Sequence, residues 1–228
     1  MRNTIDSYHV RYAPKSLAEV VYPSAALQQH IASIAAGDSY SNLLFYGPSH
    51  TGKTTVAQLL ATTLWGTQLN QPVRIGPDQY EEYPGIKLIK VIDNAVAMMF
   101  VDHPVVVLEE LDNFKKPKLL TDMFDRVKHL GWHWIATTNH INQIDPALRT
   151  RLTPIDWSFN TIDPFIPRIT HILQAELAAD LVPDEQLIRL SFTHMMGNDP
   201  TINLARLLDG VEQIVNKQRG VINNLRRI

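Results

Sequence analysis

Short apolar runs alternate, along the first two thirds of the chain, with longer segments whose apolar residues recur at helical spacing. The run Val105–Leu108 is apolar throughout and mostly β-branched, which predicts a strand buried on both faces. Four further strands are predicted from apolar runs or alternating apolar residues. They are Leu43–Tyr46, Val73–Ile75, Trp132–Thr137 and the segment containing Ile155, Trp157 and Phe159.

Helices are predicted between these strands and again after Pro164, where no further strand follows. Strands that alternate with helices predict a parallel sheet covered on both faces. We therefore expect an α/β domain over residues 1–162, irregular at residues 1–22, and a small helical domain over residues 163–228. The predicted helices are Ser24–Ala36, one that begins at Lys53, Ile86–Met99, Leu119–Leu130, Ile166–Ala179, Asp184–Met196 and Ile202–Gln218.

The composition is that of an ordinary globular protein, with 45% hydrophobic and 19% charged residues. The formal net charge of -2 excludes a chain that attracts nucleic acid by its bulk charge, so DNA contact requires a local patch. The absence of cysteine excludes disulfides, Cys-ligated zinc and thiol chemistry. No apolar run approaches the roughly 20 residues of a membrane span, and the polar N-terminus lacks a signal-peptide core. We expect a cytoplasmic or nucleoid-associated protein that is not secreted.

A glycine-containing loop follows the first predicted strand and opens a helix. Residues 47–54 fit the pattern Gly-x4-Gly-Lys-Ser/Thr. Its glycines let backbone N–H groups turn toward phosphate oxygens, and the helix N-terminus adds positive potential. Lys53 is expected to reach the β- and γ-phosphates of ATP, and the Thr54 hydroxyl to bind Mg²⁺. The predicted nucleotide-binding residues of this loop are Gly47, Pro48, Ser49, His50, Thr51, Gly52, Lys53, Thr54 and Thr55.

Two carboxylates, Glu109 and Glu110, directly follow the strand Val105–Leu108. Ligands bind at the carboxyl edge of a parallel sheet, so these groups are expected beside the loop. Glu109 is predicted to hold Mg²⁺, directly or through water, and Glu110 to polarise the attacking water. The first of these positions is usually Asp, and Mg²⁺ tolerates little geometric error, so Glu109 implies either a different water arrangement or slow hydrolysis.

The order of these motifs resembles the AAA+ ATPases and, within them, the clamp-loader small subunits of replication factor C and its phage counterparts. The resemblance covers about residues 9–215. It implies that Tyr12 and Pro14, in the segment Arg11–Val21, pack against the adenine. It also implies that Asn139, at the end of the predicted strand Ile135–Asn139, senses the γ-phosphate.

The segment Asp145–Leu152 resembles the family's Leu-x-Ser-Arg-Cys region, whose arginine reaches the neighbouring subunit's ATP. Arg151 takes that place, with Arg149 as an alternative. The lid arginine of the family has no counterpart in residues 197–203, and Arg206 lies one turn later. The missing lid arginine implies weak hydrolysis, or coupling of the lid by another route. We also expect the family's collar domain to be absent, which implies either that a separate mechanism joins the subunits or that the chain forms a different kind of AAA+ ring or filament.

Lys115, Lys116 and Lys118 follow the acidic strand, where ring-forming relatives face a central channel. Repeated around a ring, they would form a track for DNA phosphates. The tail is also basic, with Arg219, Arg226 and Arg227.

The leading hypothesis is an ATP-hydrolysing subunit of a DNA-associated homo- or hetero-oligomer, with ATP sites between subunits and a sliding clamp or other replication protein as partner. An alternative is an ATP-dependent regulator that assembles on DNA, or a helicase or transposase loader, with weak hydrolysis. A third is a structural subunit that does not hydrolyse ATP.

Overall fold

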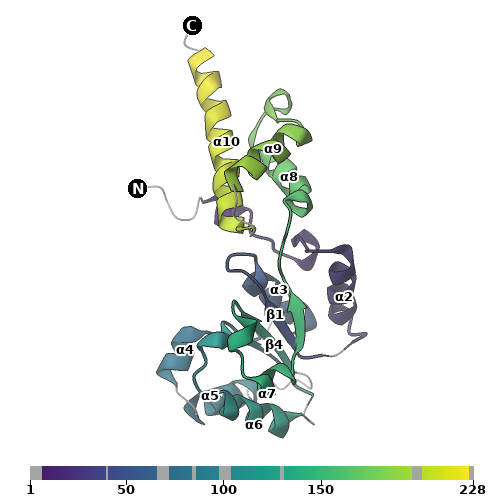
Figure 1. The fold of residues 1–228 in the computed structure, drawn as a ribbon, viewed down its shortest axis with the longest axis vertical. Coiled ribbons are helices and arrows are strands. Elements are labelled where there is room, and N and C mark those ends of the chain that lie inside the picture. The colour runs from purple at the N-terminus through teal and green to yellow at the C-terminus, as the bar shows by residue number, and fades with distance from the viewer. Residues whose placement is uncertain are drawn as a thin grey trace. The chain divides into compact units, whose positions relative to one another are not determined.

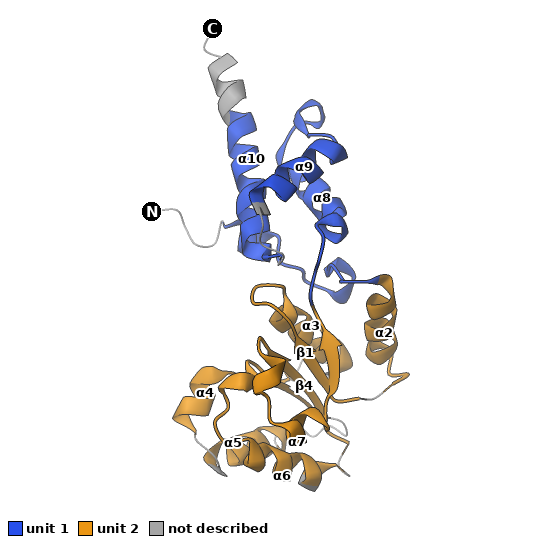
Figure 2. Ribbon diagram, viewed as in Figure 1, with its two compact units in different colours: residues 1–24, 158–228 blue, residues 25–157 orange. Residues whose placement is uncertain are grey.

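The computed structural model describes residues 7–39, 41–65, 72–83, 86–97, 104–128, 131–196 and 202–225. The chain divides into two compact units (Figure 2). The α/β unit is Ala25–Trp157, and the helical unit combines Met1–Ser24 with Ser158–Ile228. Within the described part of the chain, no helix has both the length and the apolar character needed to cross a membrane.

The α/β unit is built on a five-stranded sheet in the order β2-β3-β4-β1-β5, and each pairing is parallel (Figure 1). Parallel neighbours need crossover connections, which the helices between the strands supply. The predicted α/β parallel-sheet fold is confirmed. The strands are β1 (Leu43–Tyr46), β2 (Val73–Ile75), β3 (Val105–Leu108), β4 (His133–Thr138) and β5 (Thr153–Asp156).

Helices cover both faces of the sheet because successive strand side chains point to opposite faces. The helix α3 packs against β1, β3 and β4 on one face. On the other face, Leu44, Val106 and Ala136 join a buried core with side chains from α5 and α6. The helices of this unit are α2 (Ala25–Ala35), α3 (Lys53–Trp65), α4 (Pro77–Glu82), α5 (Ile86–Ala97), α6 (Pro117–Val127) and α7 (Pro146–Arg149), with single 3-10 turns η3 (Leu111–Asn113) and η4 (Ile141–Gln143).

In the helical unit, α8, α9 and α10 pack pairwise, and the short α1 packs on α10. The fully buried Leu173, Phe192 and Val211, one from each long helix, lie in its core. The elements are α1 (Tyr8–Arg11), η2 (Leu17–Glu19), η5 (Asp163–Phe165), α8 (Ile166–Glu176), η6 (Ala179–Leu181), α9 (Glu185–Met196) and α10 (Leu204–Leu225).

Glu176, at the end of α8, ties the N-terminal segment to the helices. Its side chain is 7% exposed and accepts hydrogen bonds from Arg11 Nη1 at 2.8 Å, Tyr12 Oη at 2.5 Å and Arg219 Nη2 at 2.7 Å. Burial acts to raise the pKa of Glu176, but these hydrogen bonds outweigh it and the pKa is lowered. Residues far apart in sequence thus meet at one carboxylate.

The sequence expectations and the structure differ in the last strand and in the N-terminal stretch. The alternation that ended at Phe159 predicted a longer last strand, but β5 ends at Asp156. The stretch predicted as irregular contains α1 and η2. The N-terminal segment groups with the helical unit rather than with the α/β unit, because Glu176 and α10 hold it there. The functional boundary near residue 162 stays a prediction.

Candidate functional site

The glycine-containing loop lies between the end of β1 and the start of α3. Gly47 and Gly52 have φ values of 142° and 90°, and His50 has a φ of 59°. A residue without a Cβ adopts such angles at little cost. The loop therefore needs glycine at Gly47 and Gly52, the two glycine positions of the motif.

Lys53, the first residue of α3, is buried under this loop. Its side chain curls back so that Nζ donates to the carbonyl oxygens of Gly47 at 3.0 Å and Pro48 at 2.6 Å. The residue is 6% exposed. Burial lowers the pKa of Lys53 to about 8, and the charges of Asp112 and Glu110 oppose the shift. A buried cation with acidic neighbours thus lies beneath the loop.

The base of the loop is anchored by Thr51. Its hydroxyl donates to the Pro48 carbonyl at 2.9 Å, and its own carbonyl accepts from Trp157 Nε1 at 3.0 Å. Trp157 packs edge-on against Phe45 of β1, with ring centroids 5.4 Å apart. These contacts hold the loop to the sheet. Ser49 and His50 are exposed, whereas Thr54 and Thr55 are half-buried.

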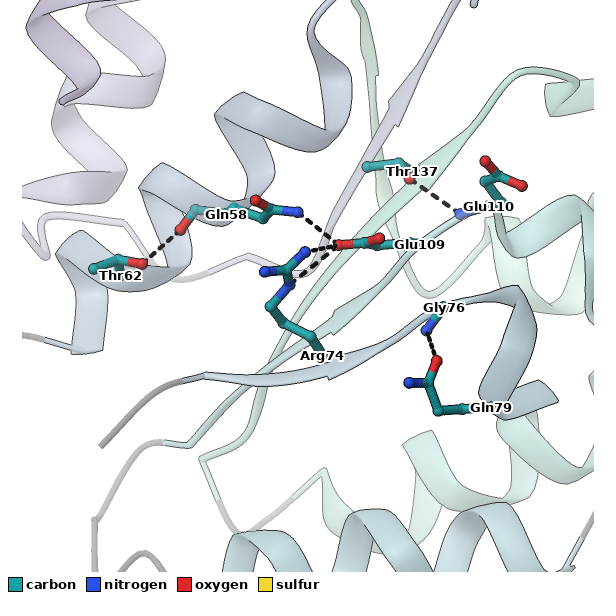
Figure 3. Close-up of polar contacts among 8 residues, drawn as sticks. All are labelled: Gln58, Thr62, Arg74, Gly76, Gln79, Glu109, Glu110 and Thr137. Atoms are coloured by element: carbon teal, nitrogen blue, oxygen red, sulfur yellow. Dashed lines mark hydrogen bonds and ion pairs between the residues drawn. The ribbon is translucent and has the colours of Figure 1, made fainter. Parts of the chain in front are cut away.

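Glu109 is held by two side chains from neighbouring elements (Figure 3). Its Oε1 accepts from Gln58 Nε2 at 2.8 Å and from Arg74 Nη2 and Nε at 3.0 and 3.3 Å. Gln58 lies one turn beyond Thr54 on α3, and Arg74 lies on β2. The predicted metal ligand is therefore engaged in an ion pair in this structure.

Glu110 adopts a left-handed backbone conformation, with φ 51° and ψ 56°. Such angles in a residue other than glycine are costly and are concentrated at functional sites. Its backbone N–H donates to Thr137 Oγ1 at 3.1 Å, and its carboxylate accepts from Asn113 Nδ2 at 2.8 Å. The turn after β3 is thus fixed by β4 and by its own 3-10 helix.

Asp112 is a candidate site residue that the sequence reasoning missed. Its Oδ1 accepts from Thr138 Oγ1 at 2.8 Å, and Thr138 lies opposite Tyr46, the residue before Gly47. The feature of the sequence that could have identified it is a cluster of acidic residues. Asp112 is the third carboxylate in the four residues that follow β3. The structure brings it together with Lys53 and Glu110.

The predicted sensor and arginine finger lie in the same unit. Asn139 directly follows β4, at the carboxyl edge of the sheet. Arg151 donates through Nε and Nη2 to both oxygens of Asp125, at 2.9 and 2.6 Å, and through Nη1 to the Ala147 carbonyl at 2.6 Å. Arg151 is thus held by α6 and α7 of its own chain, and its role toward a neighbouring subunit stays a prediction.

Tyr12 and Pro14, the predicted adenine contacts, belong to the helical unit, whereas the loop belongs to the α/β unit. In the helical unit, the ring of Tyr12 lies 5.4 Å from that of Tyr8. Residues 197–201, part of the segment without the family's lid arginine, lie outside the described residues, as do Arg226 and Arg227. Their predicted roles stay untested.

The predicted DNA lysines are exposed. Lys118 lies in the first turn of α6. Lys115 and Lys116 line a cavity of about 590 Å³ together with Tyr80, Phe114 and Asn113. Because Asn113 also holds Glu110, this cavity lies next to the acidic turn.

The donor set near the loop fits a magnesium ion. Mg²⁺ takes hard oxygen ligands and is bound by one or two carboxylates together with waters and substrate phosphates. The Thr54 hydroxyl and the carboxylates of Glu109, Glu110 and Asp112 are donors of this kind. Among the described residues, no group of three or more His, Cys, Asp or Glu side chains could hold a metal by itself, so an ion here would depend on the nucleotide.

The sequence comparisons agree with the motifs. Residues 43–157 match the family described as "ATPase family associated with various cellular activities (AAA)". The chain is 25% identical over 177 residues to the probable replication factor C subunit 5 of Dictyostelium discoideum, and 24% identical over 178 residues to replication factor C small subunit 1 of Pyrobaculum arsenaticum. Each alignment covers 73% of this chain but only 49% and 51% of the relatives, so the chain spans about half the length of the curated relatives it matches.

Solved structures agree in fold. The AAA domain of FIGL-1 in complex with ADP superposes with a TM-score of 0.61 at 14% identity, over 95% of this chain and 78% of that one. A variant of Thermotoga maritima RuvB gives 0.54 at 18% identity, over 88% and 72%. The family match spans the whole sheet, from β1 to the residue after β5, so this chain belongs to the AAA family of ATPases.

Proposed function

We propose that this chain binds ATP with Mg²⁺ in the loop of residues 47–54 and hydrolyses it as one subunit of a DNA-associated oligomer, in the manner of a clamp-loader small subunit. The observation that carries the proposal is the convergence on Lys53. A buried ammonium lies under the loop, and the negative charges of Asp112 and Glu110, both in the turn after β3, act on it.

The residues of the loop would act together on the triphosphate. Lys53 would leave the Gly47 and Pro48 carbonyls and contact the β- and γ-phosphates, while loop N–H groups bind their oxygens. Thr54 would ligate Mg²⁺, which neutralises charge on the phosphates.

Glu110, fixed by Thr137 and Asn113, would orient the attacking water and accept its proton. Asn139 would contact the γ-phosphate, and Tyr12 and Pro14 the adenine.

Assembly would complete the site. Arg151 would leave Asp125, contact the γ-phosphate of the ATP bound by a neighbouring subunit, and neutralise charge in the transition state.

The exposed Lys115, Lys116 and Lys118 would bind DNA phosphates. Two relatives are named as replication factor C subunits, which supports a role in DNA replication or repair with a sliding clamp as partner. The protein would act in the cytoplasm or nucleoid.

A second function is favoured by two contacts. Glu109 is paired with Arg74, and Arg151 is paired with Asp125 of its own chain. Both contacts would slow turnover if they persist in the assembly. A regulator that assembles on DNA with ATP, or loads a helicase or transposase, needs little turnover. It would use ATP binding rather than hydrolysis to change subunit contacts.

The steady-state rate of ATP hydrolysis, with and without primed DNA and a sliding clamp, tests the proposal. The matched control is Glu110→Gln, which keeps the size of the side chain and removes the base. We expect DNA and clamp together to stimulate the wild-type protein and not the variant. ATP-dependent filaments on any duplex, with little turnover, would favour the regulator. A rate unchanged by Glu110→Gln would contradict hydrolysis at this site.

A further inference from the structure

We infer that Asp125 is an autoinhibitory partner of Arg151, which competes for the guanidinium with the γ-phosphate of a neighbouring subunit's ATP. The inference rests on the proposed function, in which Arg151 contacts that phosphate. It adds a residue that regulates this step and so makes the contact depend on the nucleotide state of the neighbour.

The guanidinium of Arg151 is engaged within its own chain at each of its three nitrogens. Nε and Nη2 donate to the two carboxylate oxygens of Asp125 at 2.9 and 2.6 Å, and Nη1 donates to the Ala147 carbonyl at 2.6 Å. Two parallel hydrogen bonds to one carboxylate are the strongest geometry for such a pair. The hydrogen bonds from Arg151 also lower the pKa of Asp125, so Asp125 stays ionised as a competitor near neutral pH.

Arg151 lies at the opposite edge of the sheet from the loop of its own chain. It comes shortly before Thr153, which pairs with Leu43 at the start of β1. The loop of residues 47–54 follows the other end of β1. The length of β1 therefore separates Arg151 from its own nucleotide site, and the phosphate that it contacts belongs to another copy of the chain.

The pair is accessible to such a copy. The side chain of Arg151 is 29% exposed and that of Asp125 is 56% exposed. Asp125 lies in the last turn of α6, so the carboxylate comes from a different element than the arginine. A nucleotide that approaches this surface meets a guanidinium already paired with a carboxylate.

Arg151 can exchange partners without unfolding the turn that carries it. Its backbone N–H donates to the Leu148 carbonyl at 3.0 Å, and its carbonyl accepts from Asn42 Nδ2 at 3.4 Å. These contacts fix the backbone independently of Asp125. Only the side chain has to rotate for the guanidinium to leave the carboxylate.

The strength of the pair suits a reversible restraint. Exposed ion pairs are weak, so Asp125 biases the position of Arg151 without holding it permanently. A γ-phosphate carries more negative charge than one carboxylate and also accepts two hydrogen bonds from a guanidinium. ADP lacks this phosphate, so Arg151 would return to Asp125 after hydrolysis in the neighbour.

The test uses mixed oligomers of two variants. The donor chain carries Lys53→Ala, so it has Arg151 but no working loop, and the acceptor chain carries Arg151→Ala. ATP is then hydrolysed only where Arg151 of a donor reaches the nucleotide of an acceptor. Asp125→Asn, which keeps the size of the side chain and removes its charge, is added to the donor or to the acceptor. Asp122→Asn changes an exposed acid one turn earlier on α6 and is the matched control.

We expect Asp125→Asn in the donor to raise the single-turnover rate about 2- to 10-fold, because a larger fraction of Arg151 is free. The same change in the acceptor, which has no Arg151, should leave the rate unaltered, as should Asp122→Asn in the donor. This dependence on the chain that carries Arg151 separates autoinhibition from a general effect on α6.

A lower or unchanged rate with Asp125→Asn in the donor would overturn the inference and leave ATP hydrolysis by the wild-type protein standing. An equal gain from the acceptor would overturn it as well, because the effect would not pass through Arg151. If the wild-type protein hydrolyses no ATP, the proposed function fails, and the inference fails with it.

Discussion

Lys53 combines two properties that oppose each other, a positive charge and deep burial. In the folded protein, the charged form of Lys53 is stabilised by hydrogen bonds to two carbonyl oxygens and by the negative charges of two nearby acids. Burial still lowers the pKa of Lys53 to about 8. Phosphate oxygens favour the protonated form, so a bound nucleotide would raise this pKa again.

Nucleotide affinity should therefore depend on pH in a predictable direction. At pH values below the pKa of Lys53 in the nucleotide-free protein, Lys53 is charged and the nucleotide affinity is at its maximum. As pH rises through about 8, binding must take up a proton, and we expect the dissociation constant to rise by up to about tenfold per pH unit. Calorimetry at pH 7, 8 and 9 measures this rise. Lys53→Arg, whose guanidinium stays charged, should bind with no such slope, and a flat wild-type profile would contradict the assignment.

Arg151 is held by Asp125 in the isolated chain, and its proposed role appears only on assembly. Arg151→Ala should leave nucleotide affinity unchanged and slow hydrolysis by the oligomer, because arginine fingers contribute about 10³- to 10⁵-fold in other phosphoryl-transfer enzymes. Single-turnover hydrolysis measures this loss. Arg149→Ala tests the alternative finger. Wild-type turnover in Arg151→Ala would remove the finger role.

The helices α9 and α10 approach closely at Gly210. A Cβ at this position would lie 2.8 Å from a ring carbon of Phe192, which is fully buried, and would also contact the flexible end of Met195. Gly210→Val should lower the free energy of unfolding by about 1–3 kcal/mol through overpacking. Urea unfolding measures the loss. Gln213→Val, on the exposed side of α10, should change it by less than about 0.5 kcal/mol, and equal midpoints would contradict this packing.

Elements with strong local patterns could be predicted from the sequence. The strand β3 is a continuous run of branched apolar residues, and the hydrogen bonds of Lys53 to Gly47 and Pro48 lie within the loop itself. The helix α4 was missed because its six residues, Pro77–Glu82, are too few for an apolar period. The run Ile155, Trp157 and Phe159 is buried throughout, yet the strand ends at Asp156, because alternation reports burial rather than ladder hydrogen bonds.

The parts of the candidate site that are formed by residues adjacent in the sequence, such as the loop of residues 47–54, could be predicted. Asp112 could not, because it is linked to the site by a hydrogen bond from Thr138, which lies 26 residues later. The parallel sheet brings the two residues together. The Arg74 partner of Glu109 lies 35 residues earlier, on a different strand. Such contacts follow from strand order, which the sequence alone does not specify.

Across the whole chain, the N-terminal segment and α10 meet at Glu176. Hydrogen bonds hold the pKa of this carboxyl below its ordinary 4.5 against the effect of burial. A carboxyl of lowered pKa contributes stability above its unfolded value, and this is lost as pH falls through the folded one.

Glu176→Gln should therefore lower the free energy of unfolding at pH 7 by about 1–3 kcal/mol. It should also reduce the further loss as pH falls below 4.5. Urea unfolding at several pH values measures both. Glu185→Gln changes an acid that is 67% exposed in the same unit and should have an effect below about 0.5 kcal/mol. Identical pH profiles for Glu176→Gln and the wild type would contradict this linkage.

Calorimetric titration of ATP and Mg²⁺ into the wild-type protein and Lys53→Ala measures the proposed nucleotide site most directly. The account predicts one site per chain in the wild type and no measurable binding in the variant, with the fold of Lys53→Ala checked by circular dichroism. Wild-type affinity in Lys53→Ala would show that the nucleotide, if bound, lies elsewhere.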